Sequence, residues 1–203
     1  MNWQEFTALL VLATAMSFTP GPNTTLSTAI AANHGLRRAL PFAFSVAAGW
    51  GVLLTLCAWG LGALVLAVPL LSMAIKAVGV AYLLWLALKI ARSSTLSEAD
   101  AKRMTIGFWQ GAALQFVNIK AWMLALAIVS GWIAGHADWG QRLLIVLPIM
   151  MFYALSSNVT YALAGSLLRH WLAGPAGTGR RLRVFNRIMA AVLVATALWM
   201  LAL

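Results

Sequence analysis

Hydrophobic residues fill most of this chain in long runs, which are separated by short polar stretches. A helix needs about 20 mainly apolar residues to cross a membrane. By this measure the pattern predicts six spans, at about 5–32, 41–66, 71–90, 105–133, 142–168 and 184–203. The connections are short, and helices satisfy their own backbone groups in lipid. We therefore expect an all-α integral membrane protein with a single transmembrane domain over residues 1–203.

The composition supports a membrane protein and argues against other classes. The chain is 63% hydrophobic and only 9% charged, whereas a soluble domain carries about 25% charged residues. The net charge of +10 does not indicate nucleic-acid binding, because the basic residues are dispersed among hydrophobic segments and form no single stripe. Cys57 is the only cysteine, which excludes an internal disulfide framework. The first residues contain Glu5 and no basic cluster, so we expect no cleaved signal peptide.

The lysines and arginines near the ends of the predicted spans fall mainly on one side. Eleven of them belong to the first, third and fifth connections: Arg37, Arg38, Lys89, Arg92, Lys102, Arg103, Arg169, Arg180, Arg181, Arg183 and Arg187. The opposite side has only Arg142. Cytoplasmic loops carry the excess of basic residues, so the sequence predicts that both termini lie on the outer face.

Two of the predicted spans are interrupted at corresponding places. The first contains Pro20-Gly21-Pro22-Asn23, and the fourth contains polar residues within 117–120. Six spans divide into two groups of three, and a tandem repeat of three spans must be inverted in the membrane. We therefore expect inverted repeats over about 1–92 and 104–203. Paired interrupted helices in a transporter point to its substrate site.

The chemistry of the first interruption suits an anionic ligand group. Pro20 and Pro22 donate no backbone hydrogen bond, so nearby carbonyls lose their helical partners. Thr24 and Thr25 are suited to capping a second half-helix, whose positive N-terminus would attract a carboxylate. The alternative is a proline kink that only shapes helix packing.

Polar side chains inside the predicted spans complete the candidate site. Lys120 lies at the centre of the fourth span, where a cation is costly and normally faces a cavity or a partner. Lys76, by contrast, lies close enough to the start of its span to reach the interface. The candidate substrate-binding residues are Pro20, Gly21, Pro22, Asn23, Thr24, Thr25, Asn118, Lys120 and Asn158. Gln115, Ser156, Ser157, Thr160 and Tyr161 are further polar residues, and Gly49, Gly51, Gly60 and Gly62 indicate close helix packing.

Several kinds of site are absent from the sequence. Its four acidic residues, Glu5, Glu98, Asp100 and Asp138, lie in loops or at segment ends, so no carboxylate relay crosses the membrane. His, Cys, Asp and Glu form no cluster with metal-ligand spacing, and no nucleotide-binding loop is present. We therefore expect no enzymatic activity, no cofactor and no metal. A secondary transporter and a non-transporting membrane subunit remain as classes.

Motifs along nearly the whole chain resemble the LysE/RhtB family of amino-acid exporters. They are TPGPN at 19–23, HGLRRAL at 34–40, KAVGVAYLLWLALKI at 76–90, GFWQGAALQFVNIKAW at 107–122 and RRLRVFNRIMAAVL at 180–193. QFVN together with NVTYALAG at 158–165 is similar to the cysteine/O-acetylserine exporter subgroup. Ile119 stands where most members have proline, which leaves the second interruption without a helix breaker.

The resemblance implies export of small amino acids or their derivatives across a bacterial inner membrane, driven by the proton motive force. In this hypothesis the substrate carboxylate lies near Asn23-Thr24-Thr25 and Lys120, and Lys120 carries the coupled proton while the two repeats rock around the site. A membrane scaffold or sensory subunit and an inorganic-ion exporter are the alternatives. Assembly into a homo-oligomer is left open.

Overall fold

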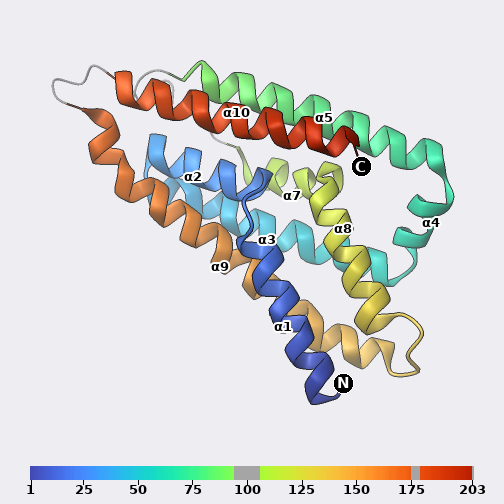
Figure 1. The fold of residues 1–203 in the computed structure, drawn as a ribbon. Coiled ribbons are helices and arrows are strands. Elements are labelled where there is room, and N and C mark those ends of the chain that lie inside the picture. Colours follow the sequence, from blue (N-terminus) through green and yellow to red (C-terminus); the bar gives the residue numbers. More distant parts are fainter. Residues whose placement is uncertain (94–105, 175–178, 203) are drawn as a thin grey trace.

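The computed structural model describes residues 1–93, 106–174 and 179–202, and all regular secondary structure in these ranges is helical. The helices are α1 (Trp3–Phe18), α2 (Pro22–His34), α3 (Leu36–Ala58), α4 (Leu61–Ala67), α5 (Pro69–Ala91), α7 (Phe108–Val117), α8 (Ile119–Ile128), the π-helical turn η1 (Val129–Ile133), α9 (Trp139–Ala173) and α10 (Arg180–Ala202). Figure 1 shows their arrangement. Glu98, Asp100, Lys102 and Arg103 lie outside the described residues.

The second predicted span is shifted in the structure. Helix α3 begins at Leu36 and ends at Ala58, whereas one helix was expected over 41–66. Gly60 has φ 104°, a left-handed conformation that glycine adopts without steric cost, so the chain turns there before α4. Gly60 therefore forms a turn, and the prediction that it packs closely between helices is wrong.

Among the described residues, four helices are long and apolar enough to cross a membrane on their own: α3, α5, α9 and α10. Helix α7 and the continuous α8–η1 helix form a fifth candidate, bent by 69° at a short break. Helices α1 and α2 have 16 and 13 residues. At 1.5 Å per residue they are roughly 24 and 20 Å long, and neither spans about 30 Å of hydrocarbon alone. The structure thus has the helices of a multi-pass membrane protein.

Glycines allow the main helix crossings to be close. A Cβ atom on Gly49 of α3 would lie 2.5 Å from the carbonyl oxygen of Ala112 on α7. A Cβ on Gly165 of α9 would overlap the carbonyl oxygen of Thr28 on α2. Small residues let membrane helices approach at their backbones, and the packing role expected for Gly49 is confirmed.

Two hydrophobic cores meet at the helix breaks. One core contains Leu26 of α2 and Leu114 of α7, together with residues of α3, α5 and α10. The other contains Leu9 of α1 and Trp122 of α8, together with residues of α3 and α9. The buried hydrophobic residues of α1 and α2 thus pack into different cores, and those of α7 and α8 do the same except for Ile119, the first residue of α8, which packs with α7. At the first break Thr19 and Pro20 are exposed and Gly21 is buried, whereas Asn118 at the second break is buried.

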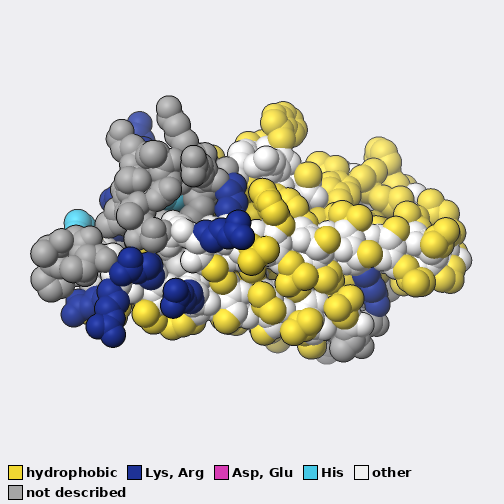
Figure 2. All heavy atoms as spheres, turned by 90° about the horizontal axis from the view of Figure 1, so that it is seen from above, with side chains coloured by type: hydrophobic (Ala, Val, Ile, Leu, Met, Phe, Trp, Pro, Cys, Tyr) yellow, Lys and Arg dark blue, Asp and Glu magenta, His cyan; other side chains and the backbone are white. Residues whose placement is uncertain are grey.

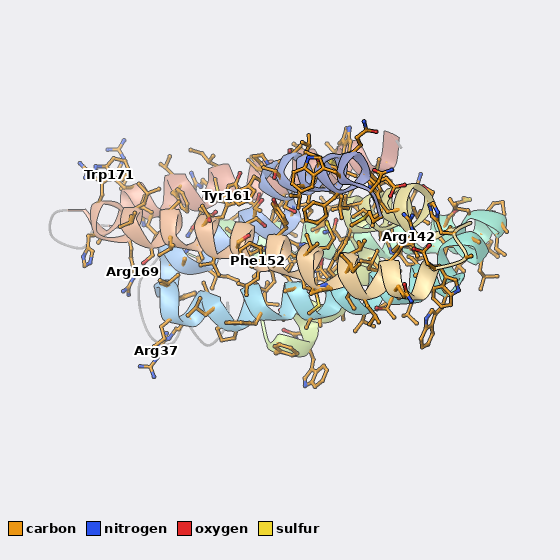
Figure 3. All side chains as sticks on the ribbon, turned by 90° about the horizontal axis from the view of Figure 1, so that it is seen from below. Arg37, Arg142, Phe152, Tyr161, Arg169 and Trp171 are labelled. Atoms are coloured by element: carbon orange, nitrogen blue, oxygen red, sulfur yellow. The ribbon has the colours of Figure 1, made fainter. Side chains whose placement is uncertain are left out.

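The two ends of the molecule differ in charge. Arg37, Arg169 and Trp171 lie at one end and Arg142 at the other (Figure 3). On the face formed by α5 and α10, most of the visible Lys and Arg side chains gather at one end, and hydrophobic side chains cover much of the rest (Figure 2). Arg142 forms ion pairs with Glu5 at 3.3 Å and Asp138 at 2.9 Å, which join the starts of α1 and α9. Glu5 and Asp138 thus lie at segment ends, as expected.

Candidate functional site

The first helix break leaves two carbonyls that side chains from distant helices satisfy. Pro22 has no N–H to donate to the carbonyl oxygen of Phe18, four residues earlier. The Tyr161 hydroxyl on α9 donates a 2.8 Å hydrogen bond to this oxygen instead. Lys120 Nζ on α8 donates a 2.7 Å hydrogen bond to the carbonyl oxygen of Thr19. The break is therefore a defined feature, stabilised by two side chains from the second half of the chain.

The first turn of α2 is capped within the PGPN-TT stretch. Gly21 is the N-cap residue, and its N–H donates to Thr24 Oγ1 at 2.9 Å. Thr24 thus caps the helix as expected, from its third position. Thr25 contributes its backbone N–H to the carbonyl oxygen of Gly21, and the capping role expected for its side chain is not observed.

The amide of Asn23 pairs with Gln115 across the two interruptions. Asn23 Nδ2 donates to Gln115 Oε1 at 2.8 Å, and Gln115 Nε2 donates to Asn23 Oδ1 at 3.2 Å. Because α2 carries Asn23 and α7 carries Gln115, this reciprocal pair joins the two broken segments. Gln115 was recognised from the sequence only as a polar residue inside a span.

The second break is present although it lacks a proline. Asn118 has φ −92° and ψ 101°, an extended conformation between α7 and α8. The carbonyl oxygen of Phe116 would accept from the Lys120 N–H in a continuous helix. It accepts from the Trp122 indole nitrogen at 2.8 Å instead. A side-chain donor thus replaces the backbone hydrogen bond that is lost at the break.

The two breaks open onto one cavity. Of the predicted site residues, Gly21, Pro22, Asn23, Thr24, Asn118, Lys120 and Asn158 line it. Pro20 and Thr25 do not: Pro20 is exposed, and Thr25 is buried away from the cavity. Trp50, Met150 and Ser157 complete much of the wall, and none of them was predicted as a site residue. Trp50 and Met150 look like ordinary core residues in the sequence, so only the packing of α3 and α9 reveals them.

The cavity presents one cation and one unused acceptor. Lys120 is its only charged side chain among the described residues. Asn118 is only 2% exposed, and its Oδ1 accepts no hydrogen bond from any residue that the structure describes. A buried polar atom without a partner is costly. Asn118 Oδ1 is therefore available for a donor group on a bound molecule.

Asn158 differs from Asn118 because both the oxygen and the nitrogen of its amide form hydrogen bonds. Its Oδ1 accepts from Ser27 Oγ at 2.8 Å, and its Nδ2 donates to the carbonyl oxygen of Ala154 at 2.8 Å. Asn158 therefore ties α9 to α2 at the wall of the cavity. Within the described ranges, no group of three or more His, Cys, Asp or Glu side chains is placed to hold a metal ion.

Comparison with known proteins identifies the family. The model of the LysE type translocator family matches residues 14–202. The cysteine/O-acetylserine efflux protein of Salmonella typhimurium (strain LT2) is 32% identical over 153 residues, which cover 75% of this chain and 78% of that protein. The protein of the same name from Escherichia coli (strain K12) is 32% identical over 158 residues, covering 78% and 80%. No solved structure matches significantly. The chain belongs to the LysE type translocator family and is therefore a membrane translocator rather than an enzyme.

Proposed function

We propose that this protein is a secondary transporter that exports small amino acids or their derivatives from the cytoplasm. The observation that carries the proposal is that one cavity between the two helix breaks contains both Lys120 and Asn118 Oδ1, an acceptor with no partner among the described residues. An amino acid carries a carboxylate and an ammonium group on one carbon. Lys120 and the N-terminus of α2 suit the carboxylate, and Asn118 Oδ1 suits the ammonium.

The cavity suits a small substrate. The volume open to the centre of a water molecule is about 60 Å³. Each water takes up about 10–15 Å³ of this volume, so the cavity has room for roughly four to six waters. In liquid water the same molecules occupy about 120–180 Å³. An amino acid with a short side chain fits this volume. The relatives are named for export of cysteine and O-acetylserine, and we extend this substrate class to the present chain.

We propose that α1 and α2 together form one span, as α7 with α8–η1 forms another. With α3, α5, α9 and α10 this makes six, arranged as inverted repeats over about 1–92 and 104–203 in a single domain. The packing of α3 on α9 and of α5 on α10 is compatible with the repeat, because each pair joins the corresponding helices of the two groups.

We place both termini on the outer side of a bacterial inner membrane. The basic end with Arg37 and Arg169 then faces the cytoplasm, as basic loops do. Arg142 at the opposite end is neutralised by its two ion pairs, so it adds little positive charge outside. The curated relatives come from bacteria, which agrees with this location.

Lys120 is the candidate carrier of the coupled proton in transport driven by the proton motive force. It is the only titratable side chain among the described cavity-lining residues. Its ammonium donates a hydrogen bond to the Thr19 carbonyl oxygen. A substrate carboxylate is a stronger acceptor than a carbonyl, so binding would draw Lys120 away from Thr19 and release the end of α1.

The test is counterflow of labelled cysteine and O-acetylserine in proteoliposomes containing the purified protein. Uptake into vesicles preloaded with unlabelled substrate, and its absence in vesicles without protein, would support transport. Ionophores that collapse the pH gradient or the membrane potential would then report the coupling. Absence of exchange for a panel of small amino acids would contradict the proposal and favour a scaffold subunit, and exchange of metal ions alone would favour an inorganic-ion exporter.

A further inference from the structure

A second cavity lies at the basic end of the molecule, far along the chain from the helix breaks. It is formed by the C-terminal end of α9 and the first turns of α10. The volume open to the centre of a water molecule is about 410 Å³, against about 60 Å³ for the central cavity. The cavity thus holds a molecule much larger than the proposed substrate.

The lining changes from charged to apolar along α10. Arg180 and Arg181 lie at the start of the helix, followed by Val184 one turn on and Ile188 two turns on. At 1.5 Å per residue, Ile188 lies about 12 Å along the helix from Arg180. The side chains of Val184 and Ile188 are about half exposed. A molecule in this cavity therefore contacts cationic side chains at the start of α10 and apolar side chains further along the helix.

The arginines are positioned to receive an anion from outside the protein. The Arg181 guanidinium lies 4.9 Å from the ring centroid of Trp171 and donates to the Trp171 carbonyl oxygen at 3.3 Å. Helices α9 and α10 contain no Asp or Glu, and the ion pairs among the described residues all involve Arg142. Tryptophan at a helix end is typical of the membrane–water interface. Arg181 is thus held at headgroup level, with no carboxylate partner in the part of the chain that the structure describes.

We propose that this cavity binds an anionic diacyl phospholipid. The phosphate pairs with Arg180 and Arg181, and an acyl chain follows Val184 and Ile188 along α10. Basic pockets between membrane helices bind anionic headgroups in this way, and the bidentate geometry of arginine suits phosphate. The proposal is independent of the transported substrate, because no lining residue is shared with the central cavity.

The test uses the full-length protein in detergent, with bound lipid measured by native mass spectrometry. Phosphatidylglycerol is the probe, and phosphatidylcholine, which is zwitterionic and has no net charge, is the comparison. We expect phosphatidylglycerol to bind at least tenfold more tightly, and the double variant R180Q/R181Q to lose at least tenfold of this affinity. The matched control is R37Q/R38Q, which removes two exposed arginines at the start of α3 and should retain binding.

Three results would overturn the proposal. They are equal binding of the two lipids, equal loss in both double variants, and equally tight binding of glycerophosphoglycerol, which has the headgroup without acyl chains. The last result would mark a site for soluble anions. Thermal unfolding checks that each variant is folded. If the double variant does not fold, binding is measured with the single variant R180Q, which changes an exposed side chain.

Discussion

Lys120 Nζ donates a 2.7 Å hydrogen bond to the carbonyl oxygen of Thr19. The cation of the second broken segment thus holds the end of α1 in the first. A Cβ atom on Gly21 would lie 3.1 Å from Lys120 Cδ, so the lysine side chain lies directly against the first break. One residue therefore contacts both the cavity and the helix end whose release we propose.

Replacing Lys120 with methionine should reduce counterflow at least tenfold per folded protein, because the carboxylate loses its cation and the Thr19 carbonyl loses its donor. Lys76→Met is the matched control, since Lys76 lies in α5 outside the cavity lining, and should transport normally. Counterflow in proteoliposomes at equal protein content checks both variants. Normal transport by Lys120→Met would remove Lys120 from the mechanism.

Asn118→Leu and Asn158→Leu should differ in their effect on stability. Asn118 Oδ1 has no partner among the described residues, so its removal should not lower the thermal midpoint, while counterflow falls at least tenfold. Asn158 bonds to Ser27 and Ala154, and its loss should cost about 1–3 kcal/mol of stability. Thermal unfolding and counterflow together separate the two roles. A strongly destabilised Asn118→Leu would show that Asn118 is structural.

Tyr161→Phe should destabilise the protein by about 1 kcal/mol, because the carbonyl oxygen of Phe18 loses the hydroxyl that substitutes for the missing N–H of Pro22. Tyr82→Phe serves as the control. The Tyr82 ring stacks on Trp85 within α5, and this contact survives the change. If both variants unfold at the same temperature as the unmodified protein, the Tyr161 hydroxyl does not stabilise the break.

Gly165→Ala and Gly140→Ala place the same methyl group at two positions of α9. A Cβ at Gly165 would overlap the Thr28 carbonyl oxygen, whereas a Cβ at Gly140 meets nothing within 4 Å. Gly165→Ala should lower the free energy of unfolding by about 1–3 kcal/mol. Gly140→Ala should not lower it, since alanine favours a helix over glycine by up to about 1 kcal/mol. Equal stability of the two variants would contradict the close α2–α9 approach.

The Asp138 carboxylate should make stability depend on pH in the acidic range. Its hydrogen bond from Arg142 lowers its pKa from the ordinary value of 3.8. A lowered folded-state pKa stabilises the protein above the unfolded pKa, and this contribution disappears as the pH falls through the folded value. Asp138→Asn should therefore unfold at a lower temperature than the unmodified protein at pH 7, and the difference should shrink below about pH 4. A difference that stays constant over this range would show that the ionised carboxylate is not responsible.

The sequence by itself determined the membrane class and most helix positions, because long apolar runs and their basic flanks depend on local composition. It also indicated the first break, since Pro20 and Pro22 prevent helical hydrogen bonding wherever they occur. It did not determine the second break. Asn118 and Ile119 are compatible with a continuous helix, and only the packed Trp122 indole supplies the donor that makes the break stable.

The roles of individual site residues were decided by tertiary structure. Asn23, Asn118 and Asn158 look alike as polar residues in apolar runs. Packing gives Asn23 a partner in Gln115 and Asn158 a partner in Ser27, but leaves Asn118 Oδ1 without one among the described residues. Which amide stays available depends on helices more than 90 residues apart along the chain. Composition and spacing carry no information about such contacts, because these depend on how the helices cross.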